Sequence, residues 1–295
     1  MTHPADTSPI LLLGTHRSGT TWLGSVLSGH PDLAYVEEPR HIWSWGNADL
    51  PDDRLDASHA RPEVVDHIRR AFEREVVRQG RRRLIEKTPS NCLRVPFVRA
   101  VYPEATLLLV VRDGRSVIRS TAEIMAGGVP ARNALKRAVR TPLRDWPAQT
   151  GKVLDMLRQK LTGGSLRFWG ARPPGWRDWL EHDHPDVVLA KQWSAMITSV
   201  LDDLEALPLR EDGSCPYHLF RYEDAAAEPD PTLHRIAQHA RLDRAELLAA
   251  RARATARPDS VEAWRDELDA STLERIRPHM EPALNRLGYD WEGSA

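Results

Sequence analysis

The stretch from Ile10 to Trp22 reads ILLLGTHRSGTTW, and it predicts an anion-binding turn between a strand and a helix. Four apolar residues precede Gly14, and apolar residues recur at helical spacing from Trp22 onward. Gly14 and Gly19 have the spacing of the phosphate-binding motif G-x-x-x-x-G-K-[ST], but Thr20 stands where that motif has lysine. Because N–H groups and a partial positive charge meet at a helix N-terminus, the turn favours phosphate or sulfate.

Side chains inside the turn strengthen this preference for an anion. Arg17 carries a planar fork of donors, and Ser18, Thr20 and Thr21 supply hydroxyl groups. Without the lysine of the motif, ATP is disfavoured as the ligand. His16 stands beside Arg17 and is an alternative catalytic base, although we expect it to shape the turn.

Length and composition place the chain among compact α/β enzymes. Its 295 residues, 41% of them apolar, suit one large domain or two small ones. The net charge of −1 argues against a general attraction to nucleic acid. We therefore interpret the run Arg81 to Arg83 as a solvated helix end before a strand.

The expected location is cytoplasmic. Cys92 and Cys215 are far apart in the sequence, which excludes a disulfide framework or a cysteine-based metal site. The first residues lack a signal-peptide pattern, and no window reaches the ~18 apolar residues that a membrane span requires. We expect no transmembrane segment.

Short apolar runs alternate with helical patterns, as is typical of a mostly parallel sheet wrapped by helices. The expected strands are residues 10–13, 33–36, 83–86, 106–111 and 217–220. In such sheets ligands bind beyond the carboxyl ends of the strands. The residues after the second to fifth strands are, in order, Glu37 with Glu38, Lys87, Arg112 and Arg221. An acid pair and several cations are thus predicted along the edge that holds the anion-binding turn.

The fourth strand ends in an arginine rather than in a metal-binding carboxylate. A triphosphatase would often place an aspartate there to hold magnesium, whereas LLLVVR places Arg112. A helix that starts at Asp113 or Gly114 would bring Ser120 back beside the strand end after roughly two turns. Arg112 and Ser120 therefore predict a second anion site.

An aromatic segment from Gly163 to Trp179 reads GGSLRFWGARPPGWRDW. Its three tryptophans lie among glycines and prolines, which predicts an ordered loop rather than a linker. Such aromatic residues can stack on flat acceptor groups, or they can hold an irregular connection onto the core. Both interpretations stay open. Lys191 to Trp193 are expected to begin the helix that follows.

Arg17-Ser18-Gly19-Thr20-Thr21-Trp22 resembles the 5′-phosphosulfate loop of the sulfotransferases that use 3′-phosphoadenosine 5′-phosphosulfate (PAPS). Arg112 with Ser120 resembles their 3′-phosphate-binding pair. The match resembles the bacterial branch of that superfamily, which is also similar to tyrosylprotein and carbohydrate sulfotransferases. The EEPR at 37–40, the EKTP at 86–89, the RYED at 221–224 and the C-terminal AWRDEL and LNRLGYD also resemble family blocks.

The resemblance implies a role for each of these positions. The donor's 5′ end would be held by Arg17, Ser18, Gly19, Thr20 and Thr21, and its 3′-phosphate by Arg112 and Ser120. Glu38, whose EEPR is similar to the EETR of tyrosylprotein sulfotransferases, would be the catalytic base. Lys87 would stabilise the leaving oxygen, a role that Arg17 could share.

Two neighbours of the proposed base leave alternatives open. Glu37 is the main rival of Glu38, because strand alternation predicts that the two side chains point to opposite sides. Arg40 could orient Glu38 or bind the acceptor.

We predict one sulfotransferase domain over residues 1–295, a P-loop-like three-layer sandwich with a central, mostly parallel sheet. An acceptor-site or lid region is expected within about residues 125–190. The predicted activity is sulfuryl transfer from PAPS, without a metal, to a hydroxyl or less readily an amine of a small-molecule, carbohydrate or lipid-linked acceptor. The alternatives are a P-loop-type small-molecule kinase and a non-catalytic nucleotide-binding protein.

Overall fold

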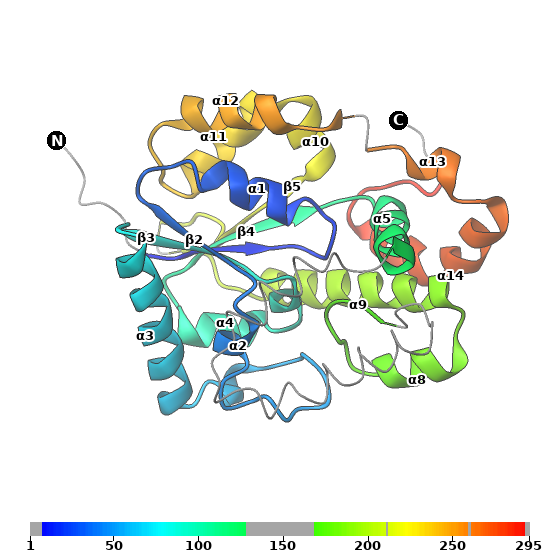
Figure 1. The fold of residues 1–295 in the computed structure, drawn as a ribbon, viewed down its shortest axis with the longest axis horizontal. Helices are drawn as coiled ribbons and strands as arrows, with labels where there is room; N and C mark the ends of the chain where they lie inside the picture. The colour runs from blue at the N-terminus through cyan, green and yellow to red at the C-terminus, as the bar shows by residue number, and fades with distance from the viewer. Residues whose placement is uncertain (1–7, 128–167, 211, 259–260, 293–295) are drawn as a thin grey trace.

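The computed structural model describes residues 8–127, 168–210, 212–258 and 261–292. Five parallel strands form one sheet with the order β2-β3-β1-β4-β5, and helices cover both of its faces (Figure 1). The strands are β1 (Ile10–Leu13), β2 (Leu33–Glu37), β3 (Arg83–Lys87), β4 (Thr106–Val111) and β5 (Tyr217–Arg221). The three-layer α/β architecture and all five strands are confirmed, and the second, third and fifth strands extend one residue further than expected.

One face of the sheet packs against four helices around Ile10, Leu12, Leu108 and Val110. These helices are α1 (Thr20–Leu27), α10 (Tyr222–Ala227), α11 (Pro229–His239) and α12 (Ala245–Thr255). They form the upper layer in Figure 1. Because side chains alternate along a strand, the odd-numbered residues of β1 face the other layer.

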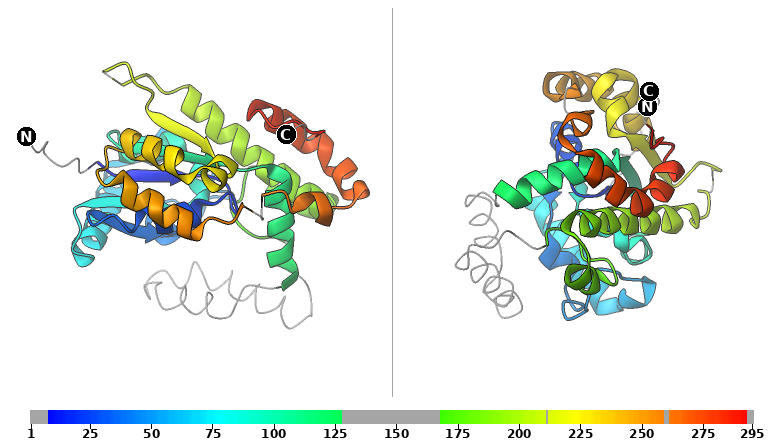
Figure 2. Two further views of the ribbon diagram at one scale, coloured as in Figure 1. Left: turned by 90° about the horizontal axis from the view of Figure 1, so that it is seen from above. Right: turned by 90° about the vertical axis from the view of Figure 1, so that its right-hand side faces the viewer.

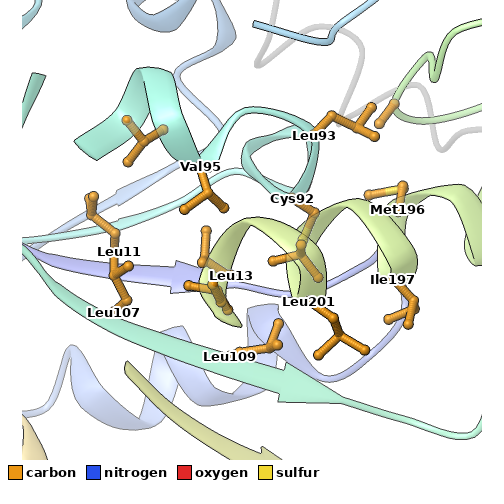
Figure 3. Close-up of a cluster of buried hydrophobic side chains, with 14 of the residues drawn as sticks. Leu11, Leu13, Cys92, Leu93, Val95, Leu107, Leu109, Met196, Ile197 and Leu201 are labelled. Carbon is orange, nitrogen blue, oxygen red and sulfur yellow. The ribbon is translucent and has the colours of Figure 1, made fainter. Parts of the chain in front are cut away.

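The opposite face of the sheet carries the larger core (Figure 3). Leu11 and Leu13 of β1 and Leu107 and Leu109 of β4 meet α9 there, whose Leu201 is buried. The elements of this layer are α2 (Arg40–Trp43), the short 3₁₀ helices η1 (Ala57–His59) and η2 (Pro89–Leu93), α3 (Pro62–Arg78), α4 (Val95–Val101) and α9 (Pro185–Glu205). On α3, Val64, Ile68 and Phe72 are buried, as the helical spacing predicts.

The remaining helices lie around the carboxyl end of the sheet (Figure 2). They are α5 (Gly114–Gly127), α8 (Trp176–His182), α13 (Trp264–Glu267) and α14 (Ala270–Arg286). None of the helices in the described part of the chain is both long enough and apolar enough to cross a membrane. Most of the region expected to contain the acceptor site or lid falls on residues 128–167, outside the described residues.

Two local expectations were wrong. The helix expected to begin at Lys191 begins at Pro185, where His184 accepts a capping hydrogen bond from the Asp186 N–H. Arg81 and Arg82 are exposed as expected, but Arg83 is only 3% exposed, because its guanidinium donates to the carbonyl oxygens of Ser8 and Ala240.

Candidate active site

The turn after β1 is a tight cradle that requires glycine at two positions. Gly14 (φ 154°) and Gly19 (φ 94°) have positive φ angles. A Cβ atom on Gly14 would lie 2.6 Å from Thr20 Cγ2 and 2.7 Å from the Val110 carbonyl oxygen, and one on Gly19 would collide with the Tyr222 ring. α1 begins at Thr20 without a side-chain cap, which leaves its first N–H groups to bind an anion over the turn.

Arg17, Arg112 and Ser120 lie together beyond the ends of β1 and β4. Arg17 Nε donates to Ser120 Oγ at 2.9 Å, and Arg112 Nη1 donates to the Arg17 carbonyl oxygen at 3.2 Å. The Arg112 guanidinium also stacks on the Tyr222 ring, 4.8 Å from its centroid. α5 starts at Gly114 and brings Ser120 back to the strand end, as its spacing predicts. The two anion sites inferred from the sequence are therefore adjacent.

A half-buried carboxylate that had no predicted role binds the backbone directly after Arg112. Glu223 of the RYED block accepts hydrogen bonds from the Asp113 N–H at 3.0 Å and from the Tyr289 hydroxyl at 2.8 Å. Asp113 in turn pairs with Arg115 at 2.7 Å. The C-terminal GYD block thus fixes the start of α5, which carries Ser120.

The hydroxyl groups of the turn have different partners. Ser18 Oγ donates to the Thr15 carbonyl oxygen at 2.7 Å, so it stabilises the turn itself. Thr21 Oγ1 donates to Glu37 Oε1 at 3.2 Å and accepts from Lys87 Nζ at 3.0 Å. Thr21 therefore joins the anion-binding turn to the end of β3.

Lys87 is the centre of a cluster at the carboxyl end of β3. Its side chain is 1% exposed, and Nζ lies 2.9 Å from Glu38 Oε1 and 3.2 Å from Glu37 Oε1. The expectation that Glu37 and Glu38 point to opposite sides was wrong. Glu38 adopts a left-handed conformation (φ 48°), which breaks the strand alternation and turns its carboxylate back to the same lysine.

Glu38 is held in place through its backbone as well as its side chain. Its N–H donates to the Lys87 carbonyl oxygen at 2.7 Å, and Arg40 Nη2 lies 3.6 Å from Oε2. Burial by itself would raise the pKa of Glu38, but Lys87 and Arg40 together outweigh burial and lower the pKa from 4.5 to about 2. In this state Glu38 is a carboxylate at neutral pH, and Lys87 stabilises its charge.

A second carboxylate, Glu86, lies beside Lys87 on the other face of β3. It is 0% exposed, accepts from Thr88 Oγ1 at 2.5 Å and from Asn91 Nδ2 at 3.0 Å. Asn91 Oδ1 accepts from Arg94 Nε at 2.9 Å. Burial raises the pKa of Glu86 to about 7. Thr88 stands at the N-cap position of η2, but its hydroxyl donates to Glu86 and makes no capping hydrogen bond to the helix.

His16, the alternative base, packs inside the turn. It is 5% exposed, and burial, followed by the positive charge of Arg40, lowers its pKa from 6.5 to about 3. Its ring meets the edge of Trp169 at 4.9 Å between centroids. The expected role of shaping the turn agrees with this packing.

The described part of the aromatic segment begins at Phe168 and is fastened to the chain after β2. Asp53 exchanges backbone and side-chain hydrogen bonds with Arg172, and Trp176 Nε1 donates to the Pro51 carbonyl oxygen at 3.0 Å. α8 begins at Trp176, so the segment is not wholly a loop. Trp176 thus holds this irregular connection onto the chain after β2.

Arg221, the cation that ends β5, has a structural partner. Its guanidinium donates to the carbonyl oxygens of Leu287 and Gly288 at 2.8 Å, and it stacks on Tyr289. These carbonyl groups belong to the C-terminal end of α14, where a cation is favourable. Among the strand-end cations, Arg112 and Lys87 face the anion-binding turn, whereas Arg221 caps a helix.

A family model described as "Sulfotransferase family" matches residues 9–168, more than half of the chain. The chain therefore belongs to the sulfotransferase family. The matched region contains the anion-binding turn, Glu38, Lys87, Arg112 and Ser120.

Curated proteins of similar sequence include protein-tyrosine sulfotransferases, and they match over part of their length. Mouse protein-tyrosine sulfotransferase 1 is 34% identical over 134 residues, which cover 40% of this chain and 35% of the mouse protein. The nodulation protein NoeE of Sinorhizobium fredii is 29% identical over 134 residues, which cover 39% and 32% of the two chains. The chain thus spans about a third of the length of the curated relatives it matches.

Solved structures share the fold at low sequence identity. The sulfotransferase domain of the curacin biosynthetic pathway has a TM-score of 0.57 and 15% identity, with 97% of this chain and 99% of that chain covered. The sulfotransferase domain of the Synechococcus PCC 7002 olefin synthase has a TM-score of 0.55 and 17% identity over 97% and 98% of the chains. Both are similar to this chain over nearly its whole length.

Proposed function

We propose that this chain transfers the sulfuryl group of PAPS to a hydroxyl group of a small-molecule, carbohydrate or lipid-linked acceptor. One observation carries the proposal: an anion cradle with two arginines lies directly beside a buried lysine that is paired with a carboxylate. A donor with a phosphosulfate at one end and a 3′-phosphate at the other needs such adjacent anion sites. An amine acceptor is the less favoured alternative.

The residues of the turn fit the donor. The 5′ end would bind to the N–H groups of residues 17–21, with Arg17 and the Thr21 hydroxyl beside it. The 3′-phosphate would bind Arg112 and Ser120. Because Arg17 already bonds to Ser120 at 2.9 Å, the donor would separate this pair and insert a phosphate between the guanidinium groups and the hydroxyl.

Lys87 and Glu38 would divide the chemistry between them. The acceptor oxygen forms a bond to sulfur while the bond from sulfur to the bridging phosphate oxygen breaks. Lys87 would stabilise the negative charge that develops on the leaving oxygen, and Glu38 would take the proton of the acceptor hydroxyl. The products are the sulfated acceptor and 3′-phosphoadenosine 5′-phosphate (PAP).

The ion pair between Lys87 and Glu38 would keep the base inactive before the donor binds. A carboxylate with a pKa of about 2 is a weak base at neutral pH. Negative charge of the donor would draw the ammonium group of Lys87 away from Glu38, and the pKa of Glu38 would then rise. The base would thus become competent only with donor in place.

The donor site can be tested without knowledge of the acceptor. We would measure thermal shifts with PAP, AMP, ADP and ATP, each with magnesium and with EDTA, since a ligand that binds the folded state raises the melting temperature. We expect selective stabilisation by PAP in EDTA. Stabilisation by ATP only with magnesium would overturn the proposal in favour of a kinase.

A further inference from the structure

The segment from Phe168 to Arg172 adds an aromatic side chain to the acceptor side of the site. Resting on the proposed function, we infer that Trp169 is the platform on which the acceptor stacks, so that acceptors with a flat apolar face beside the reacting hydroxyl are preferred. No part of the proposed donor chemistry requires this residue.

Trp169 lies directly against the anion-binding turn. Its ring meets His16 edge-on, with 4.9 Å between centroids and an angle of 60° between the planes. The next residue, Gly170 (φ 105°), is so close to His16 that a Cβ atom there would lie 2.6 Å from Cε1. His16 immediately precedes Arg17, so Trp169 borders the place where the donor's sulfuryl end is expected.

His16 also connects Trp169 to the proposed base. The charges that act on the His16 imidazole include those of Arg40, Glu38 and Lys87, which places all three in its electrostatic surroundings. Trp169 therefore packs on a side chain that adjoins the turn proposed for the donor's sulfuryl end and that feels the charge of the proposed base, Glu38. An acceptor hydroxyl has to lie between these two groups.

The backbone that carries Trp169 is rigidly held. Gln192 Nε2 of α9 donates to the carbonyl oxygens of Trp169 at 3.0 Å and of Ala171 at 2.7 Å. Arg172 is bound to Asp53 through its N–H at 2.7 Å and through its guanidinium at 3.1 Å. These bonds fix the segment to α9 on one side and to the chain after β2 on the other.

The indole is only half-buried, so part of it is open to a ligand. A fixed, partly exposed aromatic ring binds flat groups by stacking at little entropic cost. Phenols offer such a face, and so does the C–H face of a sugar ring. Both place a hydroxyl group close to the plane of the stacked ring.

The test uses the full chain saturated with PAP and three probes: 4-nitrophenol, methyl β-galactopyranoside and 1-hexanol. Binding of each probe at millimolar concentration would be measured by saturation-transfer NMR for the wild type and for Trp169→Ala, Trp169→Phe and Trp45→Ala. Trp45 is the matched control, because it is a loop tryptophan stacked on His67 of α3. PAP affinity of every variant would be measured in parallel.

We expect one or both flat probes to bind the wild type better than 1-hexanol does. The same flat probe should bind Trp169→Ala about tenfold more weakly than the wild type, and it should bind Trp169→Phe and Trp45→Ala nearly as well as the wild type. The preferred flat probe distinguishes an aryl from a sugar acceptor. Equal binding of a flat probe to wild type and Trp169→Ala would overturn the inference, as would binding of neither flat probe. If the wild type did not bind PAP, the proposed function would be refuted instead.

Discussion

At the end of β3, the charged side chains on the two faces of the sheet differ in their partners and in the direction of their pKa shifts. On the face toward α1, Lys87 meets two carboxylates that are partly open to solvent, Glu37 at 44% and Glu38 at 23% side-chain exposure. On the face toward η2, Glu86 is fully buried and bonds to neutral groups of Thr88 and Asn91. The pKa of Glu38 is lowered to about 2, whereas burial raises that of Glu86 to about 7.

Under the proposed function, this difference separates the groups that would react from the groups that support them, although Lys87 and Glu86 are consecutive residues. Charges on the α1 face can be redistributed when an anion binds, because their partners are ions near solvent. The η2 face is a closed hydrogen-bonded frame that also reaches the anion-binding turn, since the Gly14 N–H donates to Cys92 Sγ at 3.2 Å. A rigid frame that supports the charged groups is the arrangement that preorganised catalysis requires.

The largest expected effect is on turnover. Glu38→Gln should lower kcat by about 10²- to 10⁴-fold, because a general base is lost, while PAP binding changes little. Steady-state sulfation of an accepted acceptor and PAP thermal shifts would measure the two quantities. The matched control is Glu37→Gln, since Glu37 also pairs with Lys87 at 3.2 Å.

A small effect of Glu38→Gln and a large effect of Glu37→Gln would reverse the assignment of the base. Equal losses in both variants would show that the carboxylates act only through Lys87. In that case Lys87→Met would itself lower kcat, and combining it with Glu37→Gln or Glu38→Gln would cause no further loss of kcat.

Donor affinity gives the next largest effect. Arg17→Ala and Arg112→Ala should each weaken PAP binding by roughly 10- to 100-fold, because each removes charge-assisted hydrogen bonds to a phosphate. Isothermal titration with PAP would measure this. Arg221→Ala is the strand-end control: its guanidinium binds the end of α14, so we expect a lower melting temperature and unchanged PAP affinity.

Variants of Glu86 test whether the hydrogen bonds on the η2 face of β3 stabilise the fold. Glu86→Ala should lower the free energy of unfolding by about 1–3 kcal/mol, because the buried Thr88 and Asn91 groups lose their partner. Urea unfolding would measure it. Glu86→Gln keeps one acceptor and one donor for the same two residues and should retain most of the stability. If Glu86→Ala were as stable as the wild type, the frame would have no stabilising role.

The sequence was sufficient for the parts of the site that depend on residue type and spacing. The anion-binding turn, the positions of the five strands and the return of Ser120 on α5 follow from glycine spacing, apolar runs and helical periodicity. These signals are local. Because the carboxyl ends of parallel strands lie at the same edge of a sheet, the residues that follow the strands are brought together there.

Other features depend on long-range packing, which spacing does not reveal. Nothing in the residue type predicts the left-handed backbone of Glu38, which overrides strand alternation. The burial of Arg83 depends on carbonyl groups of Ser8 and Ala240 that are distant in the sequence. The hydrogen bonds of Glu86 likewise depend on the position of η2, whose Asn91 side chain donates to its carboxylate.

The smallest expected effect is a difference in the pH dependence of stability. The folded-state pKa of Glu38 lies below its ordinary value of 4.5, so the stability it contributes is present above pH 4.5 and is lost as pH falls toward about 2. That of Glu86 lies above 4.5, so its contribution is complete below pH 4.5 and is lost as pH rises through about 7.

The two glutamine variants should therefore diverge from the wild type in opposite pH ranges. Urea midpoints between pH 4 and 8, roughly the range in which such a fold stays native, should show Glu86→Gln gaining on the wild type as pH rises to about 7 and no further change above it. Glu38→Gln should differ from the wild type by a constant amount over most of that range and converge only toward acid. A Glu86→Gln difference that stayed flat from pH 4 to 8 would mean that Glu86 is ionised throughout, and the contrast between the two faces of β3 would then be one of exposure and not of charge.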